Sequence, residues 1–91
     1  MKISVTKEFR ERYQKLPASI QRKIEKQEGL FLANPLHPSL HTEKLEPKHK
    51  AYWSFRVDYN YRVLFCFLSA DEISLITVGT HDWVYRFKLK C

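Results

Sequence analysis

His81 is the side chain of this sequence best suited to acid–base chemistry, and it lies in the stretch VGTHDWVYRF near the C-terminal end. Histidine is the residue whose unperturbed pKa lies close to working pH. Asp82 follows it and could orient the imidazole or cap a turn, and Tyr85 lies four residues beyond His81. From the spacing alone, the alternative is a turn histidine that is hydrogen-bonded to the backbone and followed by an aromatic C-terminal anchor.

The residues before His81 predict the sheet that must position it. The segments YWSFRVD, RVLFCFL and EISLITVG each have a side-chain period of two, and the short segments YNY and SAD separate them. Alternation of this kind, bounded by turn residues, is typical of strands joined by hairpins. We therefore expect a three-stranded antiparallel meander over residues 52–79.

The register of the first hairpin decides which face Arg62 occupies. A three-residue loop over residues 59–61 places Arg62 opposite Asp58, on the face of Arg56. A two-residue loop over residues 59–60 would instead place it opposite an apolar residue, on the face meant for the core. Because a slip of one residue moves every side chain to the other face, only the longer loop keeps all charges out of the core. Arg56 and Arg62 should then lie side by side on a polar face.

The N-terminal part predicts a short strand and two helices. The segment KISV alternates and contains β-branched residues, as a short first strand would, and Thr6 can cap the helix that follows it. The apolar residues of that helix recur at helical spacing and are Phe9, Tyr13 and Leu16. Pro17 ends this helix and suits the first turn of a second one.

The second helix should run to Asn34 and Pro35, with one apolar stripe formed by Ile20, Ile24 and Phe31. Such a helical hairpin is amphipathic enough to cover one face of a sheet. The predicted class is therefore α+β, with two N-terminal helices packed on a twisted antiparallel sheet of about four strands, the short first strand included. Residues 35–50 have no clean period and read as a basic loop, with a short strand around residues 40–45.

Length and composition predict one domain, residues 1–91, because a second core would have too little chain to bury itself. The formal charge of +6 favours a polyanionic partner such as nucleic acid, although a surface that is merely cationic would give the same value. No apolar run is long enough to cross a bilayer, and the start MKISVTKEFRER lacks the apolar stretch of a signal peptide. We expect a cytoplasmic protein in which Cys66 is a small core residue and Cys91 lies at a frayed end.

The order strand, helix, helix and meander, together with the segments AYWSFRVDYNYRVLF and LITVGTHDWVYR, resembles the RelE/ParE superfamily of toxins from toxin–antitoxin systems. The resemblance runs from the first strand to Arg86. Many members carry Gly-His-Arg where this chain has GTHDWVY, and this segment is similar to the histidine-bearing, mRNA-cutting branch of YafQ-, HigB- and YoeB-like toxins. The resemblance implies a RelE-like fold.

The resemblance also implies an activity, namely metal-independent, ribosome-dependent mRNA cleavage without any cofactor. In that reaction the ribose 2′-hydroxyl attacks the adjacent phosphate and leaves a cyclic phosphate. The reaction needs a base, an acid and cations that stabilise the charge on phosphorus. The catalytic residues that the resemblance implies are Arg56, Arg62, His81 and Tyr85. The arginines could equally pair with Asp58 on a solvated face, and Tyr85 could belong to a core.

In the basic loop, the resemblance implies contacts to RNA from His41, Lys44, Lys48, His49 and Lys50. The general base stays open among His41, Glu43, Lys44 and His81. A solvated run of charges is the alternative for the loop.

The resemblance implies three macromolecular partners, which are a cognate antitoxin, the ribosome and mRNA. DNA would be bound only through the antitoxin complex, and no membrane is involved. An exposed apolar patch would suit the antitoxin, because Leu30, Phe31 and Leu32 cannot all face inward from one helix. Two other functions remain open, a ParE-like inhibitor of DNA gyrase without catalysis and a catalytically inactive module that only binds antitoxin.

Overall fold

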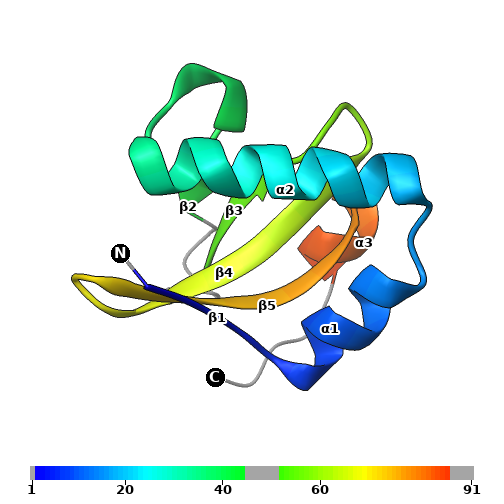
Figure 1. Cartoon of the computed structure of the whole chain (residues 1–91), viewed down its shortest axis with the longest axis horizontal. Helices are drawn as coiled ribbons and strands as arrows, with labels where there is room; N and C mark the ends of the chain where they lie inside the picture. The colour runs from blue at the N-terminus through cyan, green and yellow to red at the C-terminus, as the bar shows by residue number, and fades with distance from the viewer. Residues whose placement is uncertain (1, 45–51, 87–91) are drawn as a thin grey trace.

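Two N-terminal helices pack against one face of a five-stranded sheet, which confirms the predicted α+β class (Figure 1). The structure, a computed structural model, describes residues 2–44 and 52–86. Its elements in chain order are β1 (Lys2–Val5), α1 (Lys7–Gln14), α2 (Ala18–Ala33), the 3-10 helix η1 (Pro38–Leu40), β2 (Glu43–Lys44), β3 (Tyr52–Arg56), β4 (Tyr61–Ser69), β5 (Glu72–Thr80) and α3 (His81–Arg86). Within the described ranges, no helix has the length and apolar character that a bilayer crossing requires.

The sheet is mixed and has the strand order β1-β5-β4-β3-β2. It therefore has five strands rather than about four, and it is not wholly antiparallel, because β1 pairs with β5 in the parallel direction. The meander β3–β4–β5 is antiparallel, as hairpin connections require. No hairpin joins β1 to β5, and the intervening helices and strands let β1 enter the sheet edge in the parallel direction.

The N-terminal helices are fixed to the sheet by one cap and one apolar stripe. The Thr6 hydroxyl accepts a hydrogen bond from the Phe9 N–H at 3.0 Å and donates to the carbonyl of Ile76 in β5 at 2.7 Å. The predicted stripe of α2 is buried, since Ile24 and Phe31 are both 0 % exposed. Packing of these side chains against the sheet places the main core between the helices and β3–β5.

Gln27 is a buried polar residue on the same stripe of α2, and the sequence reasoning did not single it out. Its side-chain amide donates to the carbonyl of Ser39 at 3.2 Å and to that of Arg56 at 2.8 Å. A buried amide is tolerated when its hydrogen bonds are made. Its position, three residues after Ile24 and four before Phe31, was the available signal. Gln27 ties α2 to the end of β3, where the candidate site begins.

The second face of the sheet carries its own apolar cluster, which corrects the expectation of a polar face. Tyr52, Leu64 and Cys66 pack there with Val84 of α3. The residues after β5 form a short helix rather than only a turn, and this helix covers part of the second face. Cys66 is a buried core residue, as predicted, whereas Cys91 lies outside the described residues.

The hairpin between β3 and β4 has a three-residue loop, but the loop begins one residue earlier than predicted. The Val57 N–H donates to the carbonyl of Tyr61 at 3.0 Å, so the loop comprises residues 58–60. Arg62 is therefore directly opposite Arg56 and not opposite Asp58. The predicted face is right, because the difference in register is two residues.

Asp58 explains the position of the loop. Its carboxylate accepts hydrogen bonds from the N–H groups of Asn60 at 2.9 Å and Tyr61 at 2.8 Å, so it acts as the first residue of the turn. Burial raises the pKa of this carboxyl, but the Tyr61 and Asn60 hydrogen bonds and the Lys23 ammonium, 3.3 Å away, outweigh burial and lower the pKa below its ordinary 3.8. The ionised form is thus stabilised by folding.

We expect Asp58→Ala to lower the free energy of unfolding by about 1.5–3 kcal/mol at pH 7, because it removes hydrogen bonds to a charged group. Asp58→Asn should lower the free energy of unfolding by less, since its amide oxygen can still accept hydrogen bonds from the loop N–H groups. In the wild type, a depressed folded pKa means that this stabilisation is present above pH 3.8 and is lost as the pH falls through the folded pKa. Urea unfolding at pH 7 and at acid pH measures both effects.

The matched control is Asp71→Ala in the next hairpin, where the Asp71 carboxylate makes no hydrogen bond to the described residues. Equal unfolding midpoints for the two alanine variants at pH 7 would contradict the role assigned to Asp58.

Candidate functional site

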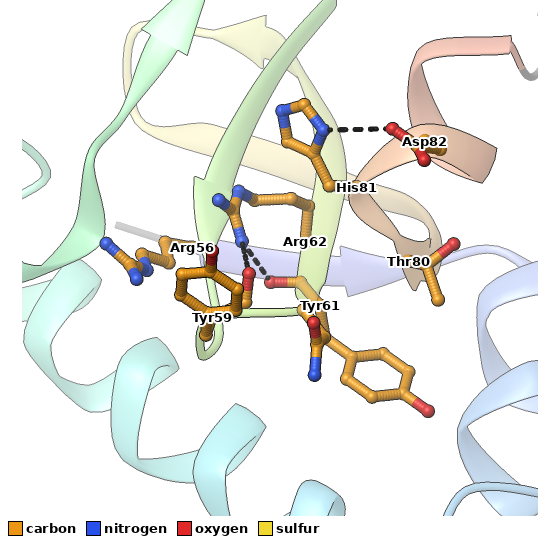
Figure 2. A pocket seen from close by; sticks show the side chains of 8 residues that line it. Arg56, Tyr59, Tyr61, Arg62, Thr80, His81 and Asp82 are labelled. Carbon is orange, nitrogen blue, oxygen red and sulfur yellow. Dashed lines mark hydrogen bonds and ion pairs between the residues drawn. The ribbon is translucent and has the colours of Figure 1, made fainter.

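An open pocket of about 670 Å³ lies where the β3–β4 hairpin meets the end of β5 (Figure 2). The residues that line it are Arg56, Tyr59, Asn60, Tyr61, Arg62, Thr80, His81 and Asp82. Three of the four predicted catalytic residues, Arg56, Arg62 and His81, are thus brought to one place. Their catalytic roles stay predictions.

Strand pairing delivers His81 to this pocket. The start of β4 runs beside the end of β5, with Tyr61 opposite Thr80 and Arg62 opposite Gly79. The His81 N–H donates to the carbonyl of Asn60 at 2.8 Å, which fixes the backbone of His81 against the hairpin loop. The imidazole is 51 % exposed, and its Nδ1 lies 3.5 Å from the Asp82 carboxylate. Asp82 can therefore orient the ring.

Arg62 is held over the hairpin loop by main-chain oxygens. Its Nη1 donates to the carbonyl of Asp58 at 2.8 Å and to that of Tyr61 at 3.0 Å, with Tyr59 more distant at 3.4 Å. Arg62 and His81 both line the pocket, as Figure 2 shows. Since a long arginine side chain loses much rotamer freedom when ordered, the loop carbonyls hold the cation in place before any ligand binds.

Arg56 lies on β3, the other strand of the hairpin. Its Nε donates to the Asp58 carbonyl at 3.3 Å, and its Nη1 lies 3.3 Å from Nε2 of His41. Because arginine only donates, a hydrogen bond in this contact requires Nε2 of His41 to be the acceptor. His41 ends η1 in the left-handed region, with φ 45°, a conformation uncommon for residues other than glycine. His41, a predicted RNA contact, therefore touches one of the residues that line the pocket without lining it itself.

The alternative in which both arginines pair with the Asp58 carboxylate does not fit the hydrogen bonds. That carboxylate binds the loop N–H groups and Lys23 instead, while both guanidiniums contact the Asp58 main-chain carbonyl. Like charges directly opposite each other in a sheet are destabilising. Such a pair is favourable when an anion bridges it, so the Arg56–Arg62 pair favours binding of a phosphate group.

The remaining predicted residues are placed differently. Lys44 lies opposite Trp53, with its ammonium 5.9 Å from the indole ring, so it projects on the helix-covered side of the sheet and away from the pocket. Glu43 lies opposite Ser54, on the side of Arg56. Tyr85 belongs to α3, but its side chain is outside the described part of the structure. Lys48, His49 and Lys50 lie outside the described residues.

Four further residues line the pocket that the sequence reasoning did not assign to it, namely Tyr59, Asn60, Tyr61 and Thr80. Tyr59 is 81 % exposed, and its ring lies 5.9 Å from the guanidinium of Arg56. An aromatic ring so exposed is available to stack on a planar ligand, as bases stack in proteins that bind single-stranded RNA. Its place in a turn of a basic protein was the signal that could have identified it.

Two helices on a mixed five-stranded sheet, with a cationic pocket at the end of the last strand, define an α+β protein with the RelE-like fold. Neither a protein-family model nor a curated protein sequence matches the chain. Solved structures of RelE/ParE-family toxins do match, at low sequence identity.

The YoeB/ParE toxin from Agrobacterium tumefaciens is 22 % identical, with a TM-score of 0.74 over 89 % of this chain and 99 % of that one. YafQ from E. coli strain BL21(DE3) is 17 % identical, with a TM-score of 0.70 over 91 % of this chain and 96 % of YafQ. The RelB–RelE antitoxin–toxin complex from Methanococcus jannaschii contains a chain that is 23 % identical, with a TM-score of 0.69 over 90 % and 94 %. These likenesses establish the shared fold.

We expect Arg56→Ala and Arg62→Ala each to weaken binding of a short single-stranded oligonucleotide, because each removes one cation from the pocket. The slope of log K against log salt should fall in magnitude by about 0.7 for each lost phosphate contact. Fluorescence anisotropy between low and physiological salt measures both quantities. Arg22→Ala on the exposed side of α2 is the matched control, and a salt slope unchanged in both pocket variants would contradict an anion site.

Proposed function

We propose that this protein is the toxin of a type II toxin–antitoxin system and acts as a metal-independent, ribosome-dependent mRNA endoribonuclease. The observation that carries the proposal is the pocket in which a half-exposed histidine lies with two directly opposed arginines. The RelE-like fold supports it, because the matching solved structures are toxins.

The chemistry follows from these side chains. A base takes the proton of the ribose 2′-hydroxyl, and the freed oxygen forms a bond to the adjacent phosphorus. The bond from phosphorus to the 5′-oxygen breaks, and an acid donates a proton to that oxygen, which leaves a 2′,3′-cyclic phosphate. Arg56 and Arg62 stabilise the additional charge on the phosphate oxygens. The protein supplies no nucleophile of its own.

His81 is the proposed acid, since it lines the same pocket as Arg62 and its Nδ1 lies 3.5 Å from the Asp82 carboxylate, which can orient the ring. His41 is a candidate base because its imidazole lies next to the pocket arginine Arg56, with Nε2 3.3 Å from Nη1. Glu43 is a second candidate on the same side of the sheet. Lys44 fits this role poorly, because it projects on the other side.

We expect His81→Asn to lower the cleavage rate by about 10²–10⁴-fold, which is the usual contribution of a positioned proton donor or acceptor. The rate is measured on ribosome-bound mRNA in single-turnover conditions. His37→Asn is the matched control, because it also removes an imidazole but retains a side chain that can cap η1. A His81→Asn protein that folds and cuts at the wild-type rate would exclude His81 as the acid.

We expect naked RNA to be cut poorly and mRNA in the ribosomal A site to be cut efficiently. The pocket is open and holds few groups that could orient a flexible strand, so part of the positioning must come from the ribosome. Primer extension on cellular mRNA after induction, beside purified RNA with and without ribosomes, measures this. Efficient cutting of naked RNA without codon phase contradicts the ribosome requirement. A DNA-damage response without mRNA cuts would instead support a gyrase inhibitor.

The proposed protein partner is a small antitoxin encoded nearby, as the RelE chain from Methanococcus jannaschii is found in complex with RelB. Such a partner could cover several large apolar side chains that are exposed, namely Val5, Leu32, Leu36, Phe67 and Leu68. The predicted cytoplasmic location belongs to this proposal, because both mRNA and ribosomes are found there.

A further inference from the structure

Arg12 of α1 connects three elements that are distant in the sequence. Its Nε donates to the carbonyl of Val78 in β5 at 2.7 Å. Its guanidinium carbon lies 3.8 Å from the centre of the Trp83 ring in α3, a cation–π contact. Glu8, 3.7 Å away on the same helix, holds the guanidinium and also accepts from the Thr77 hydroxyl at 3.2 Å. Arg12 does not line the candidate pocket.

The Trp83 ring also lies directly against the main chain of Gly79. A β-carbon at Gly79 would overlap Cε3 of Trp83 and lie 3.1 Å from its Cζ3. Only glycine therefore allows the indole to approach β5 this closely. The ring is in contact with both the Gly79 backbone and the Arg12 guanidinium, and together these contacts set how close α3 lies to β5.

The position of α3 depends on such contacts because the helix has only six residues. A helix this short is not stable by itself in water. Val84 is buried in the second apolar cluster, and the Thr80 hydroxyl accepts from the Trp83 N–H at 3.4 Å. His81 is the first residue of α3, and its N–H is held at the Asn60 carbonyl. A displacement of Trp83 would therefore tilt α3 about this anchored end and reorient the His81 side chain.

We propose that Arg12 is a positioning residue that acts through Trp83 to hold His81 in the RNA-cleaving pocket. This inference rests on the proposed function, since it assigns Arg12 a part in the same reaction. A displacement of about 1 Å at a reacting group can lower a rate by about 10²-fold. Arg12 should therefore affect the chemical step more than substrate binding, although it touches neither the pocket nor the RNA.

The experiment uses Trp53→Phe as the background, because the chain has two tryptophans and this change leaves Trp83 as the sole one. In this background, Arg12→Ala should shift the Trp83 fluorescence and the His81 imidazole NMR signal, the latter assigned from His81→Asn. It should lower kcat on ribosome-bound mRNA by about 10²-fold with KM little changed. Arg10→Ala, an exposed arginine of the same helix, is the matched control and should change none of these quantities.

Arg12→Lys is the milder variant if Arg12→Ala does not fold. One ammonium cannot both donate to Val78 and cover the indole ring as the planar guanidinium does, so Arg12→Lys should show the same changes at smaller size. In a His81→Asn background, Arg12→Ala should add no further loss of rate, because residues that act as a unit are not additive.

Two results would overturn the inference. One is a shifted Trp83 signal with an unchanged kcat, and the other is a full additional loss when Arg12→Ala is combined with His81→Asn. A wild-type protein that cuts no ribosomal mRNA would refute the proposed function instead. The Trp83 and His81 signals of Arg12→Ala would then still show whether Arg12 positions His81.

Discussion

The antiparallel pairing of β4 with β5 is the constraint on which the rest of the structure depends. It lays Arg62 opposite Gly79 and Tyr61 opposite Thr80, so the chain leaving β5 arrives beside the residues that begin β4. The same pair of strands is buried on both faces, as Phe65 contributes to one core and Leu64 to the other. A slip of one residue in this pairing would exchange the two faces and remove the cations from the pocket.

The candidate site gathers positive charge at a cost that the hairpin loop offsets. Two guanidiniums lie on directly opposed residues, and main-chain carbonyls of the loop compensate part of their repulsion. The carboxylate of Asp58 is used to shape the turn, so it does not neutralise the arginines. The pocket consequently keeps two guanidiniums that can meet an incoming anion, in line with the formal charge of +6.

Each face of the sheet contributes differently to this site. On one face, α2 buries Ile24 and Phe31 and reaches the end of β3 through Gln27, which steadies the strand that carries Arg56. On the other face, the short helix α3 is held by a small cluster and by contacts from α1, and it carries His81. The two arginines of the pocket thus belong to the β3–β4 hairpin, whereas the histidine belongs to a six-residue helix.

The sequence by itself determined the local elements of this protein. The period of two in the last three strands, the cap at Thr6 and the break at Pro17 all depend on neighbouring residues, and the structure has each of them. The shared face of Arg56 and Arg62 also followed from the sequence, since it depends only on whether the hairpin loop has an odd or an even number of residues. The nearness of Arg62 and His81 could be predicted because antiparallel strands place the start of one beside the end of the next.

Only the tertiary structure decided the features that rest on distant contacts. The parallel entry of β1 and the side to which Lys44 projects depend on which strand edge is available after folding. The burial of Gln27 depends on carbonyls of Ser39 and Arg56 that are far away in the sequence. The helix that begins at His81 is too short to form from its own propensity, so its existence and place come from the apolar cluster and the Arg12–Trp83 contact. Short-range patterns carry no information on such pairings, because their energies appear only when the chain is already compact.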